Sequence, residues 1–151
     1  MKNLLLLIVL FVVIVSCKKN KNNTTSTDIS ALISGKWKLD SVGYDLNGNG
    51  KIDSDEVSLY SPMVGVKTET YGNNGKMLDT SVTYLGIGYT TYRQYQYSLI
   101  ANDTYLQIKA LDTGMYYGDT YSYHIDNISS SKMQLFDSSM PTHARYIYVK
   151  Q

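Results

Sequence analysis

The strongest structural signals in the chain lie in one segment, Gly35 to Glu56, which reads GKWKLDSVGYDLNGNGKIDSDE. In its first half apolar and charged residues alternate: Trp37 and Leu39 fall on one face, with Lys36 and Lys38 on the other. Such alternation is typical of a half-buried β-strand. The second half is an acidic loop rich in asparagine and glycine, which are turn-forming residues. We therefore expect a strand from residue 35 to about residue 44, followed directly by a loop.

The rest of the chain repeats the strand signal at short intervals. Segments rich in tyrosine, valine, isoleucine and threonine alternate with turn signals such as Gly72–Gly75. After the first strand we expect seven more, at 64–71, 76–85, 89–101, 105–111, 115–128, 132–137 and 144–150. Mostly short connections favour an all-β, eight-stranded antiparallel up-and-down barrel, which has no free edge. A two-sheet β-sandwich is the alternative.

The residues before the first strand, Asp28 to Ser34, predict one helical turn. Asp28 is a capping residue, and Ile29, Leu32 and Ile33 have the spacing of one apolar helix face. We expect this turn to plug one end of the barrel.

The N-terminus reads MKNLLLLIVLFVVIVSC and has the pattern of an export signal. Lys2 precedes an apolar run, from Leu4 to Val15, that is shorter than the ~20 residues of a typical membrane-spanning helix. Residues 14–17 resemble the lipobox of bacterial lipoproteins, in which the cysteine is acylated and becomes the new N-terminus. The alternative is a free or buried Cys17 behind a plain signal peptide or a membrane anchor. We expect a signal peptide at 1–16, a lipidated Cys17 with a flexible tether at 17–27, and one domain at 28–151.

The tether, KKNKNNTTST after Cys17, has no aliphatic or aromatic residue and so cannot bury a face. Its lysines are suited to anionic headgroups, or simply to solubility and spacing. The expected localisation is the cell envelope, with the protein anchored by its lipid in the outer membrane, either on the periplasmic face or at the cell surface. The sequence gives no indication of the oligomeric state.

Composition excludes one class of partner. The formal net charge is +1, and four of the 14 basic residues precede residue 28, so acidic residues outnumber basic ones in the domain. We expect no nucleic-acid binding, because that function needs a clustered basic surface. The single cysteine cannot form an internal disulfide.

Residues 45–56 match the spacing of an EF-hand calcium loop, with Gly50 at the sharp turn. Calcium takes six to eight oxygen ligands, and a tight turn lets alternate side chains converge on it. The predicted ligands are Asp45, Asn47, Asn49, Lys51 through its carbonyl, Asp53 and Glu56. The flanking helices of a true EF-hand are absent, so this would be an isolated loop site. The alternative is an Asn/Gly-rich connection held by Asx turns; the position of Glu56, which a mere turn does not require, favours calcium.

The Gly35-x-Trp37 opening, just after a helical turn, resembles the start of strand A in the lipocalin superfamily. Bacterial lipocalin-like lipoproteins combine this opening with a lipobox, a polar tether and a similar acidic loop, and the resemblance spans residues 28–151. It implies a barrel closed near Trp37, with the calcium loop at the open mouth. Lipocalins often stack an arginine from the end of the last strand on the tryptophan. Here Lys150 is better placed than Arg145, which starts that strand.

We find no catalytic pattern and expect no enzyme. His124 and His143 lack the partners of a zinc site, and no nucleophile elbow or phosphate loop is present. The remaining candidate is the barrel interior, because tyrosines and one arginine alternate on two of the expected strands. The predicted ligand-lining residues are Tyr89, Arg93, Tyr95, Tyr97, Tyr121 and Tyr123, although core and surface pairing is the alternative for each.

The leading functional hypothesis is a lipid-anchored, lipocalin-like binding protein that holds a small hydrophobic or amphipathic ligand. The alternative is a structural or adhesive surface lipoprotein with a filled core, whose tyrosine-rich exterior binds glycan or protein.

Overall fold

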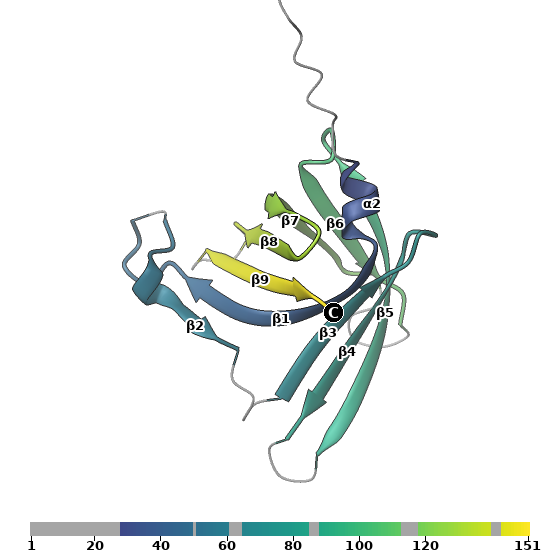
Figure 1. Cartoon of the computed structure of the whole chain (residues 1–151), viewed down its shortest axis with the longest axis horizontal. Helices are drawn as coiled ribbons and strands as arrows, with labels where there is room; N and C mark the ends of the chain where they lie inside the picture. Colours follow the sequence, from purple (N-terminus) through teal and green to yellow (C-terminus); the bar gives the residue numbers. More distant parts are fainter. Residues whose placement is uncertain (1–27, 50, 61–64, 85–87, 113–117, 140–142) are drawn as a thin grey trace, which may run out of the picture.

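The structure, a computed structural model, describes residues 28–49, 51–60, 65–84, 88–112, 118–139 and 143–151 (Figure 1). The predicted signal peptide and tether lie outside these residues. The elements are α2 (Ile29–Ile33), β1 (Gly35–Tyr44), the 3-10 turn η1 (Ser54–Glu56), β2 (Val57–Leu59), β3 (Gly65–Tyr71), β4 (Lys76–Thr83), β5 (Tyr89–Ile100), β6 (Tyr105–Ala110), β7 (Thr120–Ile128), β8 (Lys132–Asp137) and β9 (Ala144–Lys150). No helix in the described part of the chain has the length and apolar character needed to cross a bilayer.

Eight of these strands close into an antiparallel barrel. β1 pairs with β3, each later strand pairs with the next, and β9 returns to pair with β1 from Trp37 to Tyr44. This closure confirms the predicted barrel and excludes the sandwich. The predicted bounds of the first strand are confirmed. Most of the others agree within one or two residues, but β7 begins at Thr120 rather than 115, and residues 115–117 lie outside the described part.

One strand, β2, was not predicted from the sequence. It pairs with Ser41 to Gly43, on the edge of β1 that β3 leaves after Lys38. The two strands therefore share one edge of β1, and β2 is an addition to the barrel. Three residues carry too little alternation to predict a strand from sequence.

The helical turn closes one end of the barrel, as predicted. The Asp28 side chain accepts a 3.0 Å hydrogen bond from the backbone N–H of Ser30 and so caps α2. Ile33 and Trp37 are fully buried, and the indole Nε1 of Trp37 donates to the Ile33 carbonyl at 2.7 Å. Burial of a tryptophan with its N–H satisfied is worth about 3 kcal/mol or more.

Lys150 completes this end. Its Nζ lies 4.9 Å from the centre of the Trp37 ring and donates to the Leu32 carbonyl at 2.9 Å. Arg145 lies at the other end of β9, where its Nε donates to Asp126 at 2.9 Å. The expectation that Lys150 takes the place of the arginine is therefore confirmed.

The two ends of the barrel differ in character. α2 and the turns that follow β3, β5 and β7 lie at the helix end, because the strands alternate in direction. Strands β1, β4, β6 and β8 end at the opposite end, which we call the mouth end. Figure 1 shows α2 and the acidic loop at opposite ends of β1.

Candidate functional site

The inner wall of the barrel becomes accessible toward the mouth end. On β3, Tyr71 and Glu69 are 2% and 4% exposed, whereas the Lys67 side chain, one step nearer the mouth, is 28% exposed. On β5, Tyr95 is 8% exposed and Tyr89, at the mouth, is 59% exposed. Inward-facing positions on these strands are therefore sealed at the helix end and open to solvent at the other.

A buried carboxylate lies at the boundary between these two zones. Glu69 Oε1 accepts from the Tyr148 hydroxyl at 2.7 Å and from Lys67 Nζ at 3.0 Å. Its Oε2 accepts from the Tyr71 hydroxyl at 2.6 Å. Lys67 Nζ also lies 3.6 Å from Asp79 Oδ2 on β4. One ammonium group therefore joins two carboxylates, as a buried charge requires.

Titration of this cluster follows from its burial. Burial opposes the charge on Lys67, but Tyr148, Glu69 and Asp79 together outweigh it and hold the pKa of Lys67 well above its usual value. Burial also raises the pKa of Asp79, and Lys67 offsets only part of that effect. Burial first, and the Glu69 charge second, raise the pKa values of Tyr71 and Tyr148 well above 10.0.

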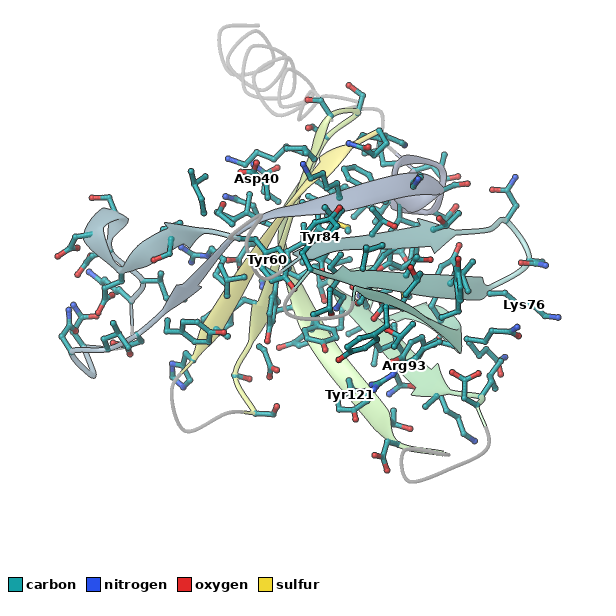
Figure 2. All side chains as sticks on the ribbon, turned by 90° about the horizontal axis from the view of Figure 1, so that it is seen from below. Asp40, Tyr60, Lys76, Tyr84, Arg93 and Tyr121 are labelled. Atoms are coloured by element: carbon teal, nitrogen blue, oxygen red, sulfur yellow. The ribbon has the colours of Figure 1, made fainter. Side chains whose placement is uncertain are left out.

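Three charged residues lie side by side on the neighbouring strands β3, β4 and β5, at the level of Glu69. Glu69 is paired with Asp79 across β3 and β4, and Asp79 is paired with Arg93 across β4 and β5. Directly opposed residues in antiparallel strands share a face, so the three side chains belong to the same inner wall. Arg93 is exposed, and Figure 2 shows it on the side of the barrel across from β1.

Of these charged residues, only Arg93 was predicted from the sequence to line the interior. Lys67 and Glu69 could not be predicted because the sequence KTET at 67–70 is polar at every position, so alternation indicates no inward face; Asp79, on β4, has the polarity of a solvent-facing residue. The available signal was the register of a closed barrel, which places Glu69 opposite Trp37 and Asp79 opposite Arg93.

The six predicted ligand-lining residues fall into two groups. Tyr95 belongs to the packed core, and Tyr97 and Tyr123 pack against it. The Tyr97 hydroxyl donates to the Gly72 carbonyl at 2.7 Å, and Tyr123 meets Tyr146 edge-on at 5.9 Å. The other three side chains are exposed toward the mouth end and come from β5 and β7: Tyr89, Arg93 and Tyr121.

The acidic loop is closed by Glu56. Its Oε1 accepts from the backbone N–H groups of Leu46 and Asn47 at 2.8 and 3.1 Å, and its Oε2 accepts from that of Asp53 at 3.0 Å. Ile52 is buried because Gly43, which has no side chain, leaves room for it against β1. The premise that a turn has no use for Glu56 is wrong, because its carboxylate bonds to the backbone at both ends of the loop.

The other predicted calcium ligands partly converge. The side-chain amides of Asn47 and Asn49 lie 3.5 and 3.0 Å from Asp53 Oδ2, and Asp45 Oδ1 accepts from the Asn49 N–H at 3.1 Å. The two amide oxygens accept from the Asn49 and Lys51 N–H groups at 2.9 and 2.7 Å. Rotation of the amides would break these bonds and present the oxygens to a cation, so the donor types suit a hard ion but the present arrangement does not yet form its shell. Lys51 is exposed and its N–H donates to Asn49 Oδ1, while Gly50 lies outside the described residues. Among the residues that the structure describes, no three acidic, histidine or cysteine residues form a metal-binding group.

Both histidines lie near carboxylates. His124 Nδ1 is 2.9 Å from Asp126 Oδ1, and Asp126 also accepts from Arg145. His143 Nδ1 is 4.0 Å from Asp45 Oδ2, and its backbone carbonyl accepts from the Asp45 N–H at 3.1 Å. A hollow of about 350 Å³ separates the acidic loop from the outer wall; it is lined by Lys51, Ile52, Asp53, Asp126, Phe136 and Arg145.

Comparison with known proteins places the fold. No family model and no curated protein matches the chain. A lipocalin-like protein from Bacteroides uniformis is similar, with a TM-score of 0.54 and 16% identity over 79% of this chain and 98% of that one. An uncharacterized protein from Bacteroides eggerthii has a TM-score of 0.50 and 14% identity over 78% and 98%. Cholesterol-bound japanin from Rhipicephalus appendiculatus has a TM-score of 0.53 and 15% identity over 80% and 77%. The chain is thus a closed eight-stranded β-barrel with the lipocalin-like fold.

Proposed function

We propose that this protein is a binding protein of the cell envelope, which holds a small hydrophobic or amphipathic ligand inside its barrel. The observation that carries the proposal is the change along the inner wall from a sealed, Trp37-centred end to an accessible end that presents Tyr89, Arg93 and Tyr121. Ligand sites of this kind combine aromatic surface with a few polar groups. The cholesterol bound by japanin, a protein of the same fold, supports the ligand class.

Two neighbouring tyrosines on β5 provide a matched test of ligand binding. Tyr89 and Tyr92 are 59% and 66% exposed, but their side chains lie on opposite faces of the strand. We expect cholesterol or a fluorescent fatty acid to bind residues 18–151 with 1:1 stoichiometry in native mass spectrometry. Tyr89→Ala should weaken binding and Tyr92→Ala should not. If neither ligand binds and no small molecule co-purifies, the protein is better explained as a surface module with a filled core.

The second part of the proposal is a lipid anchor on Cys17, supported by the lipobox-like sequence before it. Several acyl chains, at ~0.8 kcal/mol for each buried methylene, would hold the protein stably at a membrane. Cys17 is the only cysteine, so no other thiol competes for acylation. Metabolic labelling with palmitate should mark the wild-type chain and leave Cys17→Ser unlabelled. Equal labelling of the two would refute the anchor.

The third part is calcium binding by the acidic loop, with Asp45, Asn47, Asn49, Asp53 and Glu56 as side-chain ligands. Terbium is a luminescent substitute for calcium, and Tyr44 directly precedes the loop. Terbium luminescence excited through tyrosine should appear in the wild type and be lost in Glu56→Gln. Asp55→Asn removes an exposed carboxylate at a non-ligand position and is the matched control. If none of the three proteins shows luminescence, the loop does not bind the ion and is only a turn that Glu56 holds closed.

A further inference from the structure

The barrel wall formed by β3, β4 and β5 has no apolar lining between its buried floor and its rim. Above Tyr71, Met77 and Tyr95, each described inward position short of the rim is polar. These positions are Glu69 and Lys67 on β3, Asp79 and Ser81 on β4, and Arg93 and Thr91 on β5. A hydrocarbon laid on this wall would strip water from those groups without replacing its hydrogen bonds, which is unfavourable.

The charges on this wall balance. Lys67 and Arg93 face Glu69 and Asp79, and Lys67 already lies within 3.0 and 3.6 Å of the two carboxylates. Asp137, a buried acid on β8, accepts from the Ser139 N–H and hydroxyl at 2.8 and 2.6 Å. An anionic group that paired with Lys67, or a cationic group that paired with Glu69 or Asp79, would have to compete with these contacts. A hydroxyl group, which donates and accepts, can bond to the carboxylates and cations while leaving the pairs in place.

The opposite side of the interior is aromatic. Tyr123 and Tyr146, from β7 and β9, meet edge-on, and Tyr121 continues the same face of β7 toward the mouth. At the mouth end Tyr84 and Tyr89 are 52% and 59% exposed. An occupant would therefore meet polar groups on one wall, tyrosine rings on the other, and further rings at the rim.

We propose that the barrel takes an amphipathic ligand head first, with an uncharged polyhydroxyl head group against Lys67, Asp79 and Arg93. The tail then runs toward the mouth on the aromatic side, past Tyr121, and reaches Tyr84 and Tyr89 only at the rim. This inference rests on the proposed function, since it requires the interior to bind a ligand. It adds the class of head group and its orientation.

Probes that share one dodecyl tail and differ only in the head group measure how much the head group contributes to binding. The probes are dodecyl glucoside, dodecanol, dodecanoate and dodecyltrimethylammonium, each titrated by calorimetry into residues 18–151 below its micelle-forming concentration. All described strands and the packed core lie within this part of the chain. We expect the glucoside to bind at least tenfold more tightly than the other three, because only its head can donate several hydrogen bonds to the carboxylates and also accept them from the cations.

Two variants, each of which removes one positive charge, test whether the charged wall contacts the head group. Arg93→Gln should weaken glucoside binding roughly tenfold, as expected for a hydrogen bond to a charged group, and leave dodecanol binding unchanged. Lys76→Gln is the matched control: Lys76 is exposed at the start of β4, and Figure 2 shows it pointing away from the barrel. Circular dichroism and melting curves verify that both variants are folded.

The outcomes separate this inference from the proposed function. If dodecanoate or dodecanol binds as tightly as the glucoside, or if Arg93→Gln and Lys76→Gln bind the glucoside equally, the head-first arrangement is wrong while a binding barrel stands. If no dodecyl probe binds but cholesterol does, the inference also fails alone. If neither the dodecyl probes nor cholesterol nor a fatty acid binds, the proposed function fails with it.

Discussion

Replacement of Lys67 by methionine should be among the most damaging single changes in the inner wall. Methionine keeps most of the length of the side chain but removes the ammonium group that lies 3.0 Å from Glu69 and 3.6 Å from Asp79. These two acids are directly opposed across β3 and β4, and like charges in that position destabilise a sheet. Glu69, which is 4% exposed, would keep its bonds from Tyr71 and Tyr148 but lose its counter-charge.

The size of the effect follows from what remains buried. Removal of one partner from a buried ion pair typically costs 3–5 kcal/mol, and the partial exposure of Lys67 places the expected loss at about 3 kcal/mol. For a domain of this size that corresponds to a fall in Tm of about 10 °C. Because the pKa of Lys67 is raised in the folded protein, its stabilising effect is fully present below pH 10.5 and is lost as the pH rises through the folded value.

Urea unfolding at pH 7, followed by circular dichroism, measures this loss in a double-mutant cycle. Glu69→Gln alone should also destabilise, whereas adding it to Lys67→Met should cost less than the sum, since the second change removes the stranded charge. The explanation by an uncompensated Glu69 charge is refuted if Lys67→Met lowers the free energy of unfolding by less than about 1 kcal/mol, or if the effects of the two changes are additive. Lys76→Gln, an exposed lysine on the neighbouring strand, should change stability by no more than about 0.5 kcal/mol.

Three further changes test separate parts of the structure. Burial raises the pKa of Asp79, so the folded state disfavours its charge; Asp79→Asn should gain stability relative to the wild type as the pH rises above 3.8, and equal pH profiles would contradict this. Gly65 has φ of 140°, and a Cβ there would lie 1.8 Å from the Val82 carbonyl oxygen, so Gly65→Ala should cost about 2 kcal/mol or more in urea unfolding. Ala101 begins a run of three non-glycine residues with φ of 53°, 56° and 63°, a region that favours glycine. Ala101→Gly should therefore raise the free energy of unfolding by about 0.5 kcal/mol. A fall in the free energy of unfolding of about 1 kcal/mol or more would show that Ala101 is unstrained.

The barrel could be predicted because its determinants are local. Alternation placed Trp37 and Leu39 inward, turn residues such as Asn73 and Asn102 separated the strands, and a capped turn preceded the first strand. Closure followed from the number and spacing of strands. β2 could not be predicted, because its three residues are a strand only by virtue of the free edge that β1 offers them beyond Lys38.

The acidic loop shows how one residue pattern serves two physical purposes. Glu56 stands where an EF-hand ligand would stand, and the same position lets its carboxylate accept from N–H groups at both ends of the loop. Spacing alone cannot separate these roles, since each requires an acid that reaches back across a tight turn. In the proposed calcium site the cation would have to offset the hydrogen bonds that Glu56 gives up. This favours weak binding, in the range of extracellular calcium modules.

The charged wall could not be predicted from the sequence because its position inside the barrel depends on pairing between strands that are far apart in the chain. Lys67, Glu69 and Asp79 have the polarity of solvent-facing residues, and in an open sheet the face that they occupy would be the wet one. Only when β9 pairs with β1 does that face become an interior, with Glu69 opposite Trp37 and bonded to Tyr148 from the last strand. A barrel that needed only to fill its interior would gain more from leucine at these positions, because buried ion pairs are seldom more stabilising than apolar packing. Four balanced charges on one accessible wall are therefore not explained by stability alone; the proposed head-group site would require them, and the dodecyl probes test that proposal.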